Sequence, residues 1–235
     1  MLAQHIHLKQ RLLKPGHEFT IEEAREVVNH LYEHYLIDTK DRFHNLFFHE
    51  ICPLLLIAER MGNEMTRIVF TVGNAHFDGA IILGEERKTH KVEMTAAIDG
   101  YQDALRMELL AARGRAPAFQ KVRASGTKKN RIFNEDENAL EAIISQEYDQ
   151  ETLLPLLEEA LERKLKKAQT NVDYEAAWLG IVFDDWIMPI DHKKKRRFDP
   201  VCEQVLAGDR GRYHPFSRVF FIGLSRRYVF DSWNR

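Results

Sequence analysis

The sequence predicts an α/β fold, in which helices flank a mixed central sheet within a single domain of 235 residues. Short, β-branched apolar segments that are typical of strands occur in two groups along the chain. Amphipathic helical patterns precede the first group and separate it from the second. This order of elements indicates one sheet with helices on both faces. The hydrophobic content of 44% is that of an ordinary globular domain.

The N-terminal segment, residues 1–62, is expected to carry two helices after a polar lead-in. Thr20-Ile21-Glu22-Glu23 matches a capping box, so the first helix is predicted to begin there and to end near Tyr35. A second helix is predicted from about residue 39 to residue 61. Pro53 lies inside it and should kink it or split it in two, because proline lacks the amide hydrogen that a helix interior uses.

The core segment, residues 66–113, is expected to form three strands and a helix. A polar loop, Gly84–Lys88, predicts that the second and third strands pair as a hairpin. Turns are expected at Gly73-Asn74 and Asp99-Gly100. The strands are predicted over 66–72, 77–83 and 91–97, and the helix over 101–113.

The rest of the chain divides into an insertion, residues 114–170, and a C-terminal segment, residues 174–235. The insertion is expected to begin with a polar loop and to continue as two helices, over 114–130, 136–146 and 151–168 respectively. The C-terminal segment is expected to hold strands over 174–188 and 217–224, with a short helix over 199–206 between them. Residues 227–230 are expected to extend the last strand or to pair with it.

Charge and cysteine content exclude some classes of protein. The net charge of −2 creates no global field that would attract a polyanion, so a nucleic-acid contact would depend on local basic patches. The two cysteines have no metal-type spacing and are typical of a reducing compartment. The sequence shows neither a signal peptide nor an apolar run of membrane-spanning length, so a cytoplasmic protein without a membrane partner is expected.

Two acidic residues interrupt the strands of the core segment. Asp78 stands where the second strand begins, and Glu93 stands in the middle of the third. Because side chains alternate across a strand, each acid falls on a face that would otherwise be able to pack, and a hairpin would bring the two together. Burying an unpaired carboxylate is costly, so a bound cation is one explanation. Carboxylate oxygens with open positions suit Mg²⁺ or Mn²⁺. The simpler alternative is that Asp78-Gly79 is a turn.

An Asp on one strand, a Glu on the next strand and then a helix is a pattern that resembles the restriction-endonuclease-like, or PD-(D/E)xK, nuclease superfamily. The resemblance implies a restriction-endonuclease-like core in which Asp78 and Glu93 hold a divalent metal. It also implies an accessory acid from the first core helix, Glu50 or Glu59, and a polar accessory residue, Gln102, on the following helix. The implied activity is Mg²⁺- or Mn²⁺-dependent cleavage of DNA, held through phosphate contacts, in a protein that can work as a homodimer.

One position departs from the pattern of that superfamily. Thr95 stands where the family usually has the lysine that positions or deprotonates the attacking water. Lys91 lies on the same predicted strand face as Glu93 and is the candidate to supply this ammonium group. Two alternatives stay open: a catalytically inactive nuclease fold that serves as a binding or assembly component, and a structural α/β protein of unrelated fold.

Two basic stretches are candidates for contact with a phosphodiester backbone, because such contacts depend on Lys and Arg. They are His192–Arg197 and Lys128–Arg131. Each can equally be a solvated loop. No base-reading motif accompanies them, so sequence-specific recognition is not expected.

Overall fold

The structure of the protein is a computed structural model, and it describes part of the chain. The described residues are 7–8, 10–12, 14–35, 46–71, 76–98, 105, 108–109, 112, 124–127, 130–133, 150–183, 185, 198–208, 215–226 and 228–232.

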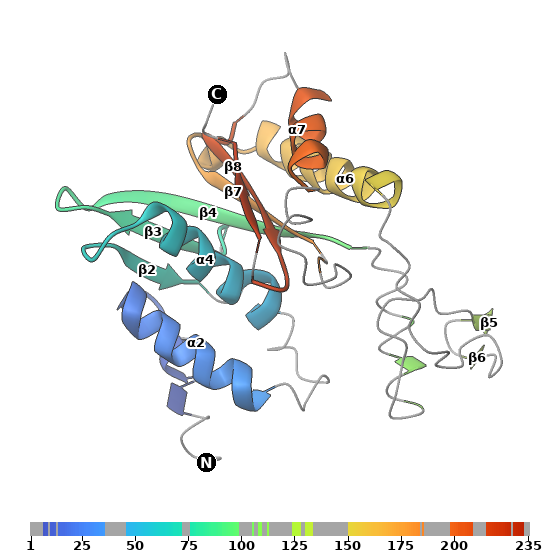
Figure 1. Ribbon diagram of the computed structural model, residues 1–235, viewed down its shortest axis with the longest axis horizontal. Helices are drawn as coiled ribbons and strands as arrows, with labels where there is room; N and C mark the ends of the chain where they lie inside the picture. Colours follow the sequence, from blue (N-terminus) through green and yellow to red (C-terminus); the bar gives the residue numbers. More distant parts are fainter. Residues whose placement is uncertain are drawn as a thin grey trace.

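A mixed sheet forms the centre of the described structure (Figure 1). Seven of the described strands build it in the order β1-β2-β3-β4-β7-β8-β9. The pairs β4–β7 and β7–β8 are parallel, and the outer pairs on both sides are antiparallel. The strands are β1 (Glu18–Thr20), β2 (Arg67–Phe70), β3 (Gly79–Leu83), β4 (Lys88–Ala97), β7 (Trp178–Phe183), β8 (Arg218–Gly223) and β9 (Val229–Asp231).

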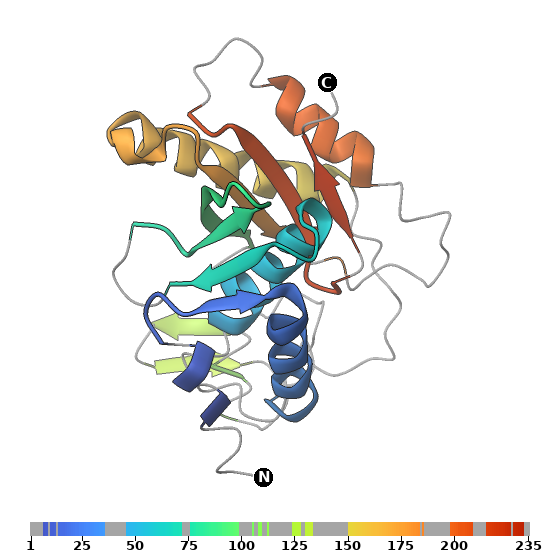
Figure 2. The ribbon, with the colours of Figure 1, turned by 90° about the vertical axis from the view of Figure 1, so that its left-hand side faces the viewer.

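Helices cover both faces of this sheet, as Figures 1 and 2 show. One face carries α2 (Ile21–Tyr35), the π-helical turn η1 (Phe47–Ile51) and α4 (Cys52–Met61). The other face carries α6 (Gln150–Gln169) and α7 (Phe198–Gly208), and the 3-10 turn η2 (Val172–Tyr174) leads into β7. The expected mixed α/β architecture with helices on both faces is therefore confirmed.

Strand alternation divides the core into two layers. Even-numbered residues of the central strands, such as Met94 and Val182, pack against α2 and α4. Odd-numbered ones, such as Ile181 and Phe221, pack against α6 and α7. All six residues of β7 are buried, because parallel strands at the centre of a two-faced sheet meet helices on both sides. Glu93 and Thr95, which are odd-numbered, therefore face α6.

Local sequence signals account for several element boundaries. The capping box is confirmed, since Thr20 Oγ1 accepts the Glu23 amide at 3.0 Å and Glu23 Oε2 accepts the Thr20 amide at 2.9 Å. The β3–β4 hairpin is confirmed, with Gly79 opposite Val92. The expected helices at 151–168 and 199–206 appear as α6 and α7, each with slightly different ends. The strand expected at 217–224 appears as β8, and β9 pairs with it in antiparallel fashion.

Two expectations about local structure are wrong. The polar stretch 114–130 is not loop throughout, because β5 (Ala124–Thr127) pairs with β6 (Asn130–Phe133) in a hairpin that lies apart from the main sheet (Figure 1). Gly126 makes this possible by adopting a φ of 86°. The strand expected over 174–188 is shorter, since Tyr174 lies in the 3-10 turn and Ala176 has a φ of 63°.

Other expectations concern residues outside the described part of the chain. They are the turns at Gly73-Asn74 and Asp99-Gly100, residue Gln102, the helix over 136–146, the pair Lys128-Lys129 and the basic run 192–197. Of the helix expected over 101–113, the structure describes residues 105, 108, 109 and 112, all of them helical.

Gly79 allows α4 to approach the start of β3. A Cβ atom at this position would collide with Leu54 Cδ2 of α4 and would lie 2.7 Å from the Val69 carbonyl oxygen. Because backbone cannot yield as a flexible side chain does, we expect Gly79→Ala to lower the free energy of unfolding by about 2–3 kcal/mol. Urea denaturation measures this loss.

Gly208 provides the matched control for that substitution. A Cβ atom added at Gly208 meets nothing within 4 Å. Gly208→Ala is therefore expected to change the free energy of unfolding by less than about 1 kcal/mol. Equal losses in the two variants would contradict the role of close packing at Gly79.

Candidate active site

The candidate site lies where β3 and β4 part. β3 pairs with β4 only as far as Gly79 and Val92, while β4 continues to Ala97 alongside β7. Asp78 lies immediately before β3 and bridges to the free edge of β4. Its amide donates to the Val92 carbonyl at 3.1 Å, and its Oδ2 accepts the Met94 amide at 2.6 Å. These two bonds fix the Asp78 carboxylate at the point of divergence.

Glu50 reaches the same point from the helical face that carries α4. It lies in the π-helical turn η1, in which the Cys52 amide donates to the Phe47 carbonyl. This wide turn precedes Pro53, which occupies the first turn of α4 where its missing amide hydrogen has no helical partner to lose. Pro53 does not split the helix, because the backbone stays helical through Ile51 and Cys52; the irregularity expected there takes the form of the π-helical turn, which places Glu50 beside the sheet.

The Glu50 and Asp78 carboxyl groups are close enough to share a proton. Burial, followed by the charge of Asp78, raises the pKa of Glu50 to about 7. Burial also raises the pKa of Asp78, and the neighbouring Glu93 adds to this effect, while the Met94 amide opposes it. The pair is therefore poised to gain or lose a proton near neutral pH, which is a property of functional carboxyl groups.

Glu93 is the third acid and is 3% exposed. Its Oε1 accepts from Lys164 Nζ at 2.5 Å and from Lys167 Nζ at 3.0 Å. Both lysines belong to α6, and their charges also lower the pKa of Asp78. α6 thus supplies the positive charge that allows an acid to be buried inside the sheet.

Thr95, the position of the departure from the PD-(D/E)xK pattern, also faces α6. Thr95 Oγ1 accepts from Arg163 Nη2 at 2.8 Å, and the same nitrogen donates to the Ala96 carbonyl at 3.2 Å. A cationic side chain is therefore present next to this position, although it comes from a helix.

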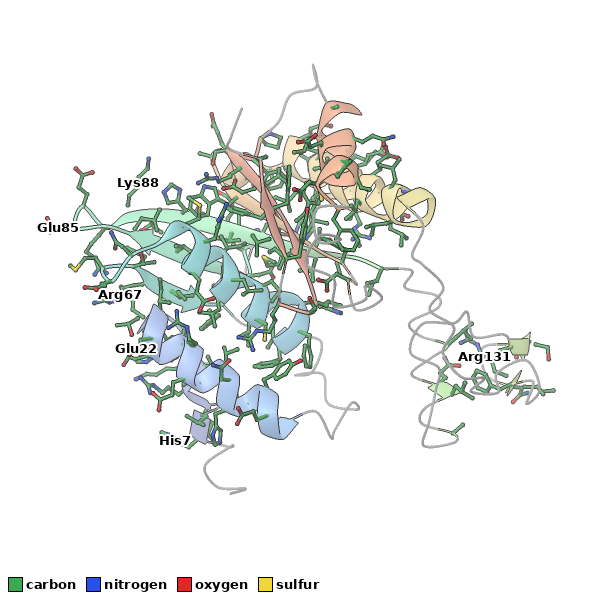
Figure 3. All side chains as sticks on the ribbon, in the orientation of Figure 1. His7, Glu22, Arg67, Glu85, Lys88 and Arg131 are labelled. Carbon is green, nitrogen blue, oxygen red and sulfur yellow. The ribbon has the colours of Figure 1, made fainter. Side chains whose placement is uncertain are left out.

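The remaining predicted residues lie in different surroundings. Lys91 is exposed, and its Nζ lies 5.0 Å from the ring centroid of Phe77. Glu59 accepts from Arg25 Nε at 2.7 Å, so of the two accessory candidates Glu50 is the one at the cluster. Gln102 lies outside the described residues. The turn end of the hairpin, marked by Glu85 and Lys88 in Figure 3, lies at the start of β4, whereas the site lies near the middle of that strand.

The cationic residues of α6 were not among the residues expected at the site. A signal was nevertheless present, because Lys164 falls within the apolar stripe that Leu157, Leu161 and Ala168 define at helical spacing. A lysine at a core position requires a buried partner. Glu93, an acid at a core position of a strand, is that partner.

The donor atoms suit a hard divalent cation, but they do not form a closed cage. Carboxylate oxygens are the ligands that Mg²⁺ and Mn²⁺ prefer, and a cation between Glu50 and Asp78 would relieve the repulsion that raises the pKa of Glu50. Among the residues that the structure describes, no group of three or more His, Cys, Asp or Glu is arranged to hold a metal. Glu93 would have to turn from the lysines of α6 to become a third ligand.

No protein-family model, curated protein or solved structure matches this chain. None of the helices in the described ranges is long and apolar enough to cross a membrane.

The raised pKa of Glu50 predicts a pH-dependent stability. Its proton is held in the fold up to about pH 7 but is lost from the unfolded chain near pH 4.5. The stabilisation that protonation gives is complete below pH 4.5 and disappears as the pH rises through 7. Glu50→Gln keeps a neutral side chain, so we expect its free energy of unfolding, relative to wild type, to rise by about 2 kcal/mol from pH 4 to pH 8. Urea denaturation across this range measures the difference, and a difference that stays constant would contradict the shift.

Proposed function

We propose that this protein is a metal-dependent phosphodiester hydrolase that acts on DNA, with a restriction-endonuclease-like core. The observation that carries the proposal is the convergence of Glu50, Asp78 and Glu93 from three separate elements at the point where β3 and β4 part, with ammonium groups against them. Glu93 is buried and the other two acids are partly buried, and placing three carboxyl groups together in this way is costly, which supports a chemical role for them.

The element order supports the core that we propose. An acid precedes β3, a second acid lies on β4 and an accessory acid comes from a helical turn against the opposite face of the sheet. We propose that Lys164 takes the part of the lysine that is missing at Thr95. Its Nζ is the nearer of the two lysine nitrogens to Glu93, whereas Lys91 extends over Phe77.

The residues divide the chemistry among them in this proposal. Asp78 and Glu50 would hold a Mg²⁺ or Mn²⁺ ion, and Glu93 would be a further ligand if it turned from the lysines. The bound ion would lower the pKa of a water molecule and stabilise charge on the phosphate. Lys164 would orient that water, and Lys167, whose side chain is 52% exposed, would meet the phosphate from the solvent side.

The test is cleavage together with metal uptake. The full chain is incubated with single-stranded and double-stranded DNA in Mg²⁺, in Mn²⁺ and in chelator, and Mn²⁺ binding is measured by calorimetry. Metal-dependent cleavage is expected, and at limiting metal its rate should rise from pH 6 to pH 8, because the metal must displace the Glu50 proton, whose pKa without metal is about 7. Cleavage that is independent of metal, or absent with either metal, would reject the proposal.

A second function, that of a non-catalytic binding or assembly component, is favoured by one observation. Glu93 is already neutralised by Lys164 and Lys167, which is a stable arrangement without any metal. This alternative predicts no Mn²⁺ uptake in calorimetry and no cleavage of any nucleic acid, so the same experiment separates the two functions.

A further inference from the structure

A row of two adjacent aromatic side chains with a lysine at each end borders the acidic site. Lys91 Nζ lies 5.0 Å from the centroid of the Phe77 ring, and Lys167 Nζ lies 5.3 Å from that of the Tyr174 ring. The two rings are 5.0 Å apart with an interplanar angle of 56°. The order along the row is therefore Lys91, Phe77, Tyr174 and Lys167.

Covalent and hydrogen bonds tie this row to the carboxylates. Phe77 directly precedes Asp78, and Lys167 contacts Glu93 at 3.0 Å. The Tyr174 hydroxyl donates to the His76 carbonyl at 3.2 Å, so η2 holds the segment that leads into Asp78. A ligand lying on the row would have its neighbouring groups at the acidic site.

Exposure decides which members of the row a ligand can reach. Tyr174 is buried and supports Phe77 from within the core, whereas Phe77 is partly exposed. The side chain over Phe77 is Lys91, which is exposed and can swing away to another anion. The Phe77 face is therefore open to a flat apolar group when Lys91 moves.

A nucleic acid strand offers flat bases with phosphates on either side, which matches an aromatic pair with a lysine at each end. Aromatic faces stack on bases, and lysines attract the phosphates on either side. A base inside a duplex is already stacked on both sides and cannot lie on Phe77 without leaving its neighbours. Resting on the proposed function, we propose that Phe77 is a stacking platform for an unpaired base next to the scissile phosphate, so that the substrate class is a single-stranded segment.

The test measures binding in chelator, so that no cleavage occurs. Fluorescence anisotropy is recorded with a labelled oligothymidylate, an abasic oligonucleotide of equal length and a hairpin duplex. The wild-type chain is expected to bind oligothymidylate more tightly than the duplex. Phe77→Leu, which keeps apolar volume but removes the ring, is expected to weaken oligothymidylate binding by about 10-fold and to leave the abasic strand unaffected.

Phe230→Leu is the matched control. Phe230 is another partly buried phenylalanine of the core layer under α6 and α7, but it lies on β9 and packs against Phe221. The Phe230→Leu variant is expected to bind all three probes as tightly as wild type does. Equal binding of oligothymidylate by Phe77→Leu and wild type, or tighter binding of the duplex by wild type, would overturn the inference.

The outcomes of this binding test are independent of the outcomes of the cleavage test for the proposed hydrolase. Phe77-dependent binding of single strands by a chain that cleaves nothing would support the platform and reject the hydrolase. Metal-dependent cleavage of a duplex without any effect of Phe77→Leu would support the hydrolase and reject the platform.

Discussion

Replacing Asp78 with asparagine is expected to lower the rate of metal-dependent DNA cleavage at least about a thousandfold, because a neutral amide is a poor ligand for a hard cation. The same change is expected to leave the fold as stable as wild type or more so. An amide oxygen can still accept the Met94 amide, and the repulsion that Asp78 exerts on Glu50 is removed. Cleavage assays in Mg²⁺ and thermal unfolding measure the two effects.

Asp185→Asn is the matched control, since Asp185 is also an aspartate next to a strand whose carboxylate accepts a backbone amide at 2.6 Å. Both its oxygens accept from Ser225, the amide at 2.6 Å and the hydroxyl at 2.5 Å, in the turn after β8. We expect this variant to lose stability, by about 1–3 kcal/mol, and to retain cleavage at temperatures where it is folded. Wild-type cleavage by Asp78→Asn would remove Asp78 from the site.

Replacing Lys164 with methionine is expected to affect both cleavage and stability. The change removes one of the two ammonium groups that contact buried Glu93, so we expect a loss of about 2–3 kcal/mol in the free energy of unfolding. If Lys164 orients the attacking water, the cleavage rate falls by about a hundredfold or more. Lys164 also lowers the pKa of Glu50, so the acid limb of the pH–rate profile is expected to move to higher pH.

Lys166→Met separates these effects from a general change in α6. Lys166 is two positions away on the same helix, is 71% exposed and pairs with Glu162 at 2.9 Å. We expect it to change the unfolding free energy by less than about 0.5 kcal/mol and to leave the pH–rate profile in place. A Lys164→Met variant that loses stability but keeps both the rate and the profile would limit Lys164 to a structural role.

Sequence signals that act over a few residues were sufficient to predict most of the helices and strands. The capping box at Thr20 and the hairpin loop before Lys88 each act over a few residues, and each predicted its element. The β5–β6 hairpin was missed because its strand residues, Ala-Ser-Gly-Thr, have little strand preference and little burial. Their pairing depends on the glycine at position 126.

The candidate site was predicted from one half of the chain only. Strand alternation placed Asp78 and Glu93 together, and the structure brings them to the same point. Strand alternation could not reveal which helix faces Glu93, because that depends on the crossover between the parallel strands β4 and β7. Strand alternation alone could point to Lys91, which shares a strand face with Glu93. Lys164 is brought to Glu93 by that crossover.

The separation of Glu93 and Lys164 by 71 residues has a consequence for how the chain acquires its structure. All three acids are synthesised before α6, so a nascent chain that has reached only residue 98 holds the carboxylates without their counter-ions. Closing the sheet over Glu93 at that stage would leave a charge unpaired in the core, which is strongly unfavourable. The order of synthesis therefore delays the assembly of the site until the second half of the chain arrives, and truncated chains would be left without a closed acidic centre.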